Sequence, residues 1–83
     1  MSYEEFEEIF DTVDSKWEGD NAYQGLQIIA KYTNNVVCAA EHDIIYSESI
    51  EKLIKAGITR EDVEQLAKLN WHIDEYESLA CFV

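Results

Sequence analysis

The stretch V-V-C-A-A-E-H-D-I-I-Y at residues 36–46 is the only long run in this chain that is typical of a β-strand rather than a helix. Valine, isoleucine and tyrosine favour strands, and consecutive side chains of a strand point to opposite faces of a sheet. The even-numbered positions, such as Cys38 and Ile44, form the more apolar face. We therefore expect one central strand whose even-numbered face packs on the core, with Glu41 and Asp43 on the partly covered opposite face.

A helix is expected at the start of the chain. Ser2 and Glu5 have the spacing of a capping box, in which a hydroxyl and a carboxylate satisfy free backbone amides at a helix start. Apolar residues then recur at helical spacing as far as Gly19, which is a natural stop. These residues are Tyr3, Phe6, Ile9, Phe10, Val13 and Trp17.

A second helix should follow, capped by Asp20 or Asn21. Asn34 and Asn35 tolerate the left-handed conformation that often ends a helix, so we place its end there. Gly25 lies in its middle, where glycine is unfavourable by ~1 kcal/mol relative to alanine. Such a glycine indicates that another element packs closely against the helix.

The segment after the strand has the start and stop signals of two short helices and a hairpin. Ser47 or Ser49 can cap the first helix, Gly57 closes it, and Thr59 caps the second. Residues 71–83 alternate, turn at E-Y-E-S and continue as an apolar run, which predicts a hairpin.

The predicted element order is therefore ααβααββ. We expect an α+β fold, with a small three-stranded, mainly antiparallel sheet and about four helices packed on it. Residues 1–83 should form a single domain, because no proline, internal repeat, linker or low-complexity segment divides the chain.

The charge of the chain excludes several functions. Six basic and 18 acidic residues give a formal charge of -12, which repels phosphate backbones and anionic lipid. Direct binding of nucleic acid or membrane is therefore not expected. The N-terminus lacks the features of a signal peptide and no apolar run approaches the ~20 residues of a membrane span, so we expect a cytoplasmic protein.

Metal and cofactor sites are also not expected. Residues of the types that bind zinc are present as Cys38, His42, His72 and Cys81. Positions four apart on a straight strand are separated by ~13 Å, too far for the first two to bind one metal. Only a cross-strand pair, such as His42 with His72 or Cys81, stays open, and we interpret the thiols as buried and the histidines as hydrogen-bonded.

Catalysis is not expected either, although Glu41, His42 and Asp43 resemble acid–base machinery. On a strand the histidine points to the opposite face from the two carboxylates, which would lie ~6.6 Å apart. The chain has no nucleophile motif and no glycine loop for phosphate. We therefore interpret these charges as the end of a half-exposed strand.

The strongest candidate site is the acidic surface of the first helix. Seven carboxylates between residues 4 and 18 give about one charge per ~3 Å of helix, close to the ~3.4 Å per charge of one nucleic-acid strand. We expect the partner-binding residues to be Glu4, Glu7, Glu8, Asp11, Asp14 and Glu18. The alternative is a solvated face that is acidic only for solubility.

A secondary acidic patch is predicted from the strand and the hairpin. Its residues are Glu41, Asp43, Asp74, Glu75 and Glu77. The carboxylates at the hairpin turn offer oxygen ligands for calcium or magnesium, but they lack the spacing and central glycine of an EF-hand. At most a weak, incidental cation site is expected there.

The runs A-A-E-H-D-I-I-Y at residues 39–46 and L-N-W-H-I-D-E-Y-E-S-L-A-C-F-V at residues 69–83 resemble a group of short acidic proteins encoded by tailed bacteriophages. The run Q-G-L-Q-I-I-A-K-Y at residues 24–32 fits as well. The resemblance implies a phage or prophage protein that acts in bacterial cytoplasm. Small acidic phage proteins often inhibit host enzymes or defence systems, sometimes by imitating DNA.

Charge and resemblance together predict a non-enzymatic phage protein that inhibits a basic, nucleic-acid-handling host protein, such as a nuclease or an anti-phage defence complex. It would act as a DNA mimic or like an anti-CRISPR protein. The alternatives are a small structural or regulatory phage protein that forms a homodimer, and a sponge for a small signalling nucleotide. The negative charge disfavours the last of these for an anionic ligand.

Overall fold

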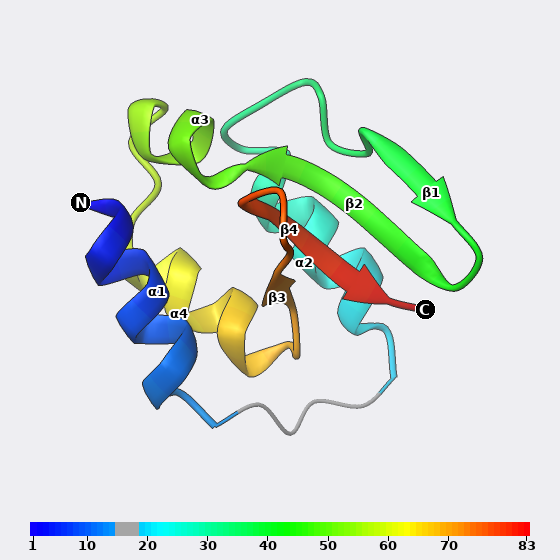
Figure 1. The fold of residues 1–83 in the computed structure, drawn as a ribbon, viewed down its shortest axis with the longest axis horizontal. Coiled ribbons are helices and arrows are strands. Elements are labelled where there is room, and N and C mark those ends of the chain that lie inside the picture. Colours follow the sequence, from blue (N-terminus) through cyan, green and yellow to red (C-terminus); the bar gives the residue numbers. More distant parts are fainter. Residues whose placement is uncertain (15–18) are drawn as a thin grey trace.

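The computed structural model describes residues 1–14 and 19–83, and it has the expected α+β fold. In chain order the elements are α1 (Tyr3–Thr12), α2 (Asn21–Ile29), β1 (Ala39–Glu41), β2 (Ile44–Ser49), α3 (Ile50–Lys55), α4 (Arg60–Lys68), β3 (His72–Ile73) and β4 (Ser78–Phe82) (Figure 1). The described strands form one four-stranded antiparallel sheet with the order β1-β2-β4-β3. The class was predicted correctly, but the sheet has four strands rather than three.

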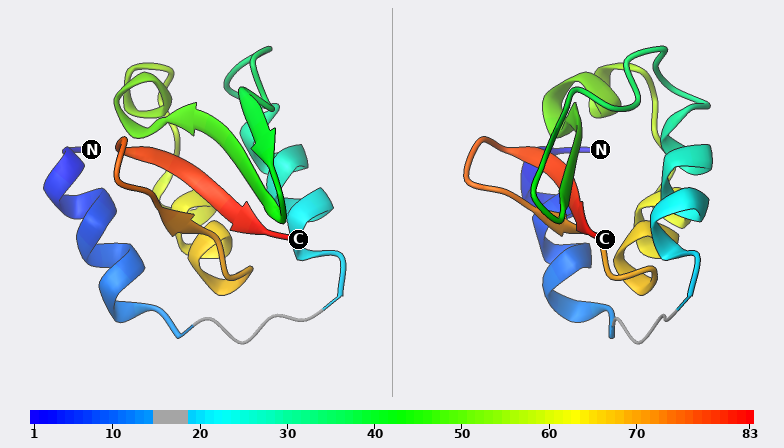
Figure 2. Two further views of the ribbon diagram at one scale, coloured as in Figure 1. Left: turned by 45° about the vertical axis from the view of Figure 1, so that its right-hand side comes forward. Right: turned by 90° about the vertical axis from the view of Figure 1, so that its right-hand side faces the viewer.

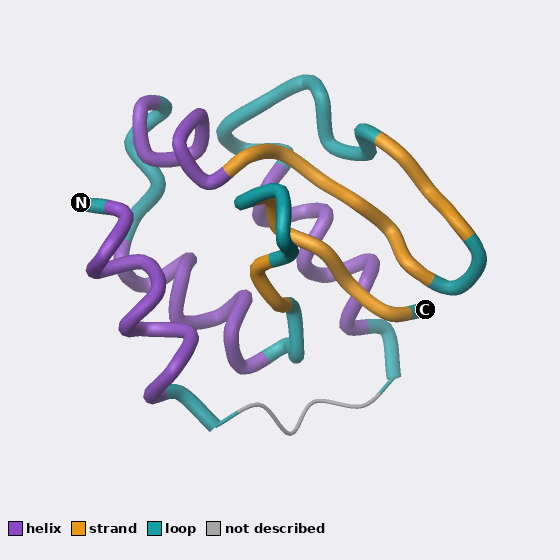
Figure 3. Tube along the Cα trace, viewed as in Figure 1, coloured by secondary structure: helices purple, strands orange, loops and turns teal. Residues whose placement is uncertain are grey.

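The extra strand arises because residues 36–46 are not one strand. The chain reverses at His42 and Asp43, which form the two-residue turn between β1 and β2, and Glu41 is paired with Ile44 (Figure 3). His42 has a φ of 54°, a conformation that histidine adopts more readily than most non-glycine residues. The expected single strand and its even-numbered core face are therefore wrong. Cys38 and all three residues of β1 are exposed.

The centre of the sheet is the pairing of β2 with β4, and the second hairpin was predicted correctly. Ile45 lies opposite Cys81 and Tyr46 opposite Ala80 in that pairing. Strand β3 pairs with the other edge of β4. The strand with the most buried residues is thus β4, because Leu79, Ala80 and Cys81 have no exposed surface.

Helices cover one side and one end of the sheet. In the turned views of Figure 2, α2 and α4 lie on one side of the sheet. Helix α1 packs against α3, α4 and β3. The core therefore lies between the sheet and the helices, and most of its large side chains come from the helices and the loops that follow them. Fully buried examples are Phe6, Ile29, Ile50, Leu53, Val63, Leu66, Leu69 and Leu79.

The cap signals mostly gave the expected helix ends. The hydroxyls of Ser2, Ser49 and Thr59 each accept a hydrogen bond from the backbone N–H three residues later. Gly57 has a φ of 87° directly after α3, and Asn70 has a φ of 65° after α4. Helix starts and stops that depend on local chemistry were therefore predictable from the sequence.

Helices α1 and α2 both end earlier than predicted. Helix α1 stops at Thr12, because Thr12, Val13 and Asp14 are weak helix formers and Val13 is already extended. The expected stop at Gly19 and the stretch that holds Trp17 lie beyond that end, and residues 15–18 are outside the described residues.

Helix α2 stops at Ile29, and neither Asn34 nor Asn35 has the left-handed conformation that was expected of a stop. Contacts beyond the helix hold this segment instead. The Tyr32 hydroxyl donates a hydrogen bond to Asp62, and the Thr33 hydroxyl donates one to Glu48. Asp20 precedes α2 but makes no side-chain capping bond.

Gly25 marks a close contact, as predicted. A Cβ atom at this position would lie 2.0 Å from Nε1 of Trp71, so only glycine fits beneath the indole ring. The indole Nε1–H donates to the Asn21 carbonyl oxygen at 3.1 Å. The Asn21 amide in turn donates to the Leu69 carbonyl oxygen at 2.8 Å. These contacts fix α2 against the segment that connects α4 to β3.

Candidate functional site

Helix α1 has one buried stripe and one acidic face. Phe6 and Ile9 are buried in the core, and the rings of Phe6 and Phe10 stack with centroids 5.5 Å apart. The exposed positions between them carry carboxylates. We define the acidic face of α1 as Glu4, Glu5, Glu7, Glu8 and Asp11.

Among the described residues, no cation compensates the acidic face of α1. In residues 1–14 and 19–83, no lysine, arginine or histidine forms an ion pair with any of its five carboxylates. The lysine and arginine ion pairs that the described residues form with one another are elsewhere: Lys31 with Asp62, Lys55 with Glu51, and Arg60 with Glu64. Five negative charges therefore lie on a ten-residue helix, which is ~15 Å long.

The candidate surface is shorter than predicted. Asp14 follows the end of α1, so it is not part of the helical face, and Glu18 is outside the described residues. The expected run of helical charges therefore ends at Asp11 in the described part of the chain, before Asp14. The four other predicted partner-binding residues, Glu4, Glu7, Glu8 and Asp11, are exposed on α1 as expected.

A hollow that was not predicted from the sequence lies beside the acidic face, between α1 and β3. Its volume is about 490 Å³. Helix α1 contributes Tyr3, Glu7, Phe10 and Asp11 to its lining, and the β3 segment contributes residues that include His72 and Asp74. We call it the α1–β3 hollow. It combines aromatic walls with carboxylates from two elements.

The titratable side chains of the α1–β3 hollow reflect burial and negative charge. Burial raises the pKa of Tyr3, and the charges of Glu77, Glu7 and Asp74 raise it further. Burial lowers the pKa of His72, and the charge of Asp74 opposes that shift. The His72 ring also stacks on Phe82, with centroids 4.8 Å apart. The lowered pKa of His72 favours its neutral form, so the carboxylates supply the charge of the hollow.

Asp74 has a structural role as well as a charge. Its Oδ1 accepts hydrogen bonds from the backbone N–H groups of Tyr76 at 2.8 Å and Ser78 at 3.0 Å, which shape the turn between β3 and β4. Its Oδ2 is buried and has no hydrogen-bond partner. The negative charge is thus held in a fixed position by the backbone.

The secondary acidic patch is only partly brought together. Glu41, Asp74 and Glu75 line one hollow of about 670 Å³, together with Cys38, Glu48 and Lys52. Glu77 lines a different hollow, beside Met1 and Tyr3. Asp43 lines neither of these two hollows, because it lies in the turn between β1 and β2.

Glu48 was missed by sequence reasoning. It is only 5% exposed, and its carboxylate accepts hydrogen bonds from the Thr33 hydroxyl at 3.0 Å and from the Ser49 backbone N–H at 2.9 Å. A glutamate between two serines gives no sequence signal for burial. Its neutral donors are consistent with a structural role in tying the 30–38 loop to the end of β2.

The four residues considered as zinc ligands are spread over the fold. Cys38 is exposed, contrary to the expectation of a buried thiol, while Cys81 is buried and accepts a hydrogen bond from the Asn21 amide at 3.5 Å. His42 lies in the turn between β1 and β2, and His72 lies in β3. Among the described residues, no group of three His, Cys, Asp or Glu residues is arranged to hold a metal ion.

The Glu41-His42-Asp43 triplet turns the chain rather than extending a strand. All three residues are exposed, and Nε2 of His42 lies 3.9 Å from Oε1 of Glu41. The expectation that strand alternation separates His42 from its neighbours is therefore wrong. The backbone carbonyl of Asp43 accepts a hydrogen bond from the N–H of Val83 at 2.7 Å, which ties the turn to the C-terminal end of β4.

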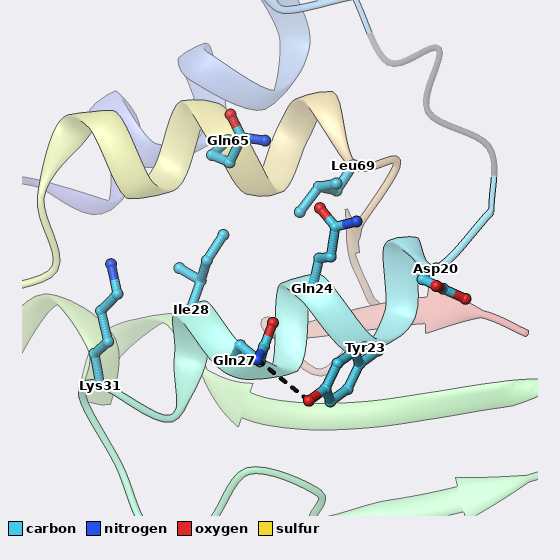
Figure 4. A pocket seen from close by; sticks show the side chains of 8 residues that line it. All are labelled: Asp20, Tyr23, Gln24, Gln27, Ile28, Lys31, Gln65 and Leu69. Carbon is cyan, nitrogen blue, oxygen red and sulfur yellow. Dashed lines mark hydrogen bonds between the residues drawn. The ribbon is translucent and has the colours of Figure 1, made fainter.

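A fourth hollow lies between α2 and α4 (Figure 4), with a volume of about 490 Å³. Its lining is rich in amides, with Gln24, Gln27 and Gln65, and Nε2 of Gln27 donates to the Tyr23 hydroxyl at 3.3 Å. Its only charged lining residues are Asp20 and Lys31, and Lys31 is paired with Asp62. The lining offers hydrogen bonds and a little apolar surface, but no acid–base pair.

No helix in the described part of the chain is long and apolar enough to cross a membrane.

Comparison with known proteins adds no assignment. No protein-family model matches the chain, and neither the curated proteins nor the solved structures contain a match.

Proposed function

We propose that this chain is a non-enzymatic binding protein that docks the acidic face of α1 on a basic, nucleic-acid-handling protein and blocks it. The observation that carries the proposal is a rigid helix with five exposed carboxylates and no ion-pair partner for them in the described residues. Such a surface is complementary to a partner whose own surface binds phosphate.

The charge spacing supports mimicry of nucleic acid even after the shortening of the helix. Five charges over ~15 Å give one per ~3 Å along the axis, compared with ~3.4 Å for a nucleic-acid strand. The like-charge pairs Glu4 with Glu8 and Glu7 with Asp11 each destabilise the helix by ~0.2–0.5 kcal/mol. A face needed only for solubility could avoid that penalty by interspersing lysines, as α3 and α4 do.

The biological setting that we propose is bacterial cytoplasm during phage infection or prophage expression. It is supported by the resemblance of residues 39–46 and 69–83 to small acidic phage proteins. The partner would then be a host nuclease or an anti-phage defence complex.

A homodimer formed through a sheet edge has weaker support. The two edge strands of the sheet, β1 and β3, have only three and two residues. They therefore offer few free backbone groups to a second copy.

The test is affinity capture from a bacterial lysate, followed by an activity assay of the captured protein. We expect a basic protein to bind at ~0.1 M salt and to be lost at ~1 M salt. The reason is that the Debye length, over which charges attract each other, shortens from ~10 Å to ~3 Å. After identification by mass spectrometry, the purified partner should lose its nucleic-acid-handling activity when the chain is added.

Two charge-reversal variants make the test specific to α1. The variant Glu8→Lys/Asp11→Lys should lose the partner. The control Glu41→Lys/Asp43→Lys changes the net charge equally at the β1–β2 hairpin, which lies far from α1 in Figure 1, and should retain it. Retention of the partner by the α1 variant, or capture that persists at ~1 M salt, would contradict the proposal.

A further inference from the structure

We propose that the α1–β3 hollow receives an arginine side chain of the basic partner. This inference rests on the proposed function and specifies the chemistry by which the acidic face recognises its target. The hollow adjoins that face directly, since Glu7 and Asp11 belong to both.

Negative charge borders the hollow on two sides. Glu7 and Asp11 come from α1, and Asp74 comes from the end of β3 across the hollow. The two backbone N–H groups that bind Oδ1 of Asp74 hold that carboxylate in place, while its Oδ2 has no partner. A cation that enters between α1 and β3 therefore meets the Asp74 carboxylate, which the backbone already holds in place, and the exposed carboxylates of Glu7 and Asp11 on α1.

The walls of the hollow favour a flat, weakly hydrated cation. Tyr3 and Phe10 supply aromatic surface, and Ile73 supplies aliphatic surface. A guanidinium group stacks on aromatic rings and presents five N–H donors that match carboxylate oxygens. A lysine ammonium is more strongly hydrated and lacks the planar face, so arginine fits this lining better.

The same lining does not suit a divalent cation. Calcium and magnesium need several oxygen ligands converging at ~2.0–2.6 Å. No three carboxylate, imidazole or thiol groups converge in this way within residues 1–14 and 19–83. The hollow therefore does not offer the ligand set that a divalent cation needs.

The experiment is an NMR titration of the isotope-labelled chain with Nα-acetyl-arginine amide. Nα-acetyl-citrulline amide, which has the same shape without the charge, is the control ligand. We expect saturable shifts of the backbone amides of Tyr3, Phe10 and Ile73 with arginine and none with citrulline. Equal shifts with both ligands, or no saturable shift at these positions, would overturn the inference.

Matched variants of α1 locate the binding. Glu7→Gln/Asp11→Asn removes the two carboxylates that line the hollow and should weaken the arginine ligand about fivefold. Glu4→Gln/Glu8→Gln removes an equal charge, also one helical turn apart, from positions outside the lining, and should weaken the arginine ligand clearly less. Both variants relieve a like-charge pair, so neither should unfold the helix. Equal weakening by both would show adsorption on the whole acidic face instead.

The outcome is separable from that of the proposed function. Suppose that the chain captures its basic partner in a salt-dependent manner but shows no arginine-specific shifts in the hollow. That result refutes only this inference. Loss of salt-dependent capture, in contrast, refutes the proposed function whichever ligand binds the hollow.

Discussion

The substitution Gly25→Ala should destabilise the fold strongly, although alanine is the better helix former. The added Cβ would lie 2.0 Å from Nε1, 2.3 Å from Cε2 and 2.7 Å from Cζ2 of Trp71. These atoms belong to a rigid ring that is only 3% exposed, so the whole indole or the whole helix must move. The contact joins α2 to the segment that leads into β3.

The expected change in the free energy of unfolding is the sum of three contributions. Alanine in place of glycine stabilises a helix interior by ~1 kcal/mol. Overpacking a core typically costs ~1–3 kcal/mol. Displacing the indole also breaks the bond from Nε1–H to the Asn21 carbonyl and leaves a buried donor unsatisfied, at a further ~1–3 kcal/mol. The expected net loss is about 3 kcal/mol, which lowers the Tm of a domain of this size by roughly 15 °C.

Thermal and urea unfolding followed by circular dichroism measure this loss. The double variant Gly25→Ala/Trp71→Phe supplies the control, because the smaller ring relieves the clash. Together with Trp71→Phe it forms a double-mutant cycle that should show a coupling of at least ~1 kcal/mol. A Gly25→Ala variant as stable as the wild type, or additive effects in the cycle, would refute the reasoning.

Three further changes test the acidic face, the half-buried His72 and a helix cap. Glu8→Lys/Asp11→Lys should raise the free energy of unfolding by about 1 kcal/mol, since each like-charge pair on α1 becomes attractive, while partner binding is lost. A lower free energy of unfolding would mean that the like-charge pairs do not destabilise α1. The pKa of His72 is lowered from 6.5 by burial, so the unfolded state binds more protons and stability should fall as pH drops below about 6.5. Urea titrations at about pH 7.5 and about pH 5.5 measure this drop in the free energy of unfolding. The variant His72→Gln should make the drop smaller, whereas the exposed control His42→Gln should leave it unchanged. Ser49→Ala removes the cap of α3 and should cost about 1 kcal/mol in the same assay, and an unchanged midpoint would speak against the cap.

Features that depend on a few neighbouring residues were predictable from the sequence. The caps at Ser2, Ser49 and Thr59 form because a hydroxyl and an amide three residues later are close in any helix start. Gly25 was recognisable because glycine in a helix interior usually has a packing reason. The exposed carboxylates of α1 followed from helical periodicity, which also placed Phe6 and Ile9 inside.

Features that depend on distant contacts were not predictable. The turn at His42 and Asp43 lacks the usual Asn-Gly or Asp-Gly signal, and it is supported by the bond between the Asp43 carbonyl and the N–H of Val83. The burial of Glu48 depends on Thr33, which is 15 residues away in the chain. The α1–β3 hollow likewise exists only because the first helix packs beside the third strand. A single sequence gives no signal for any of these pairings.

The uneven distribution of charge also has a kinetic consequence. Residues 50–68, which hold α3 and α4, contain four basic and four acidic residues and are neutral as a segment, whereas α1 carries five acidic residues and no basic one. A positively charged molecule that diffuses toward this protein is therefore turned away from α3 and α4 and toward its acidic surfaces, which include α1. Steering of this kind can bring association rate constants to ~10⁸–10⁹ M⁻¹s⁻¹ at low ionic strength. Salt should then slow association much more than it hastens dissociation, because the exposed carboxylates act mainly during the encounter.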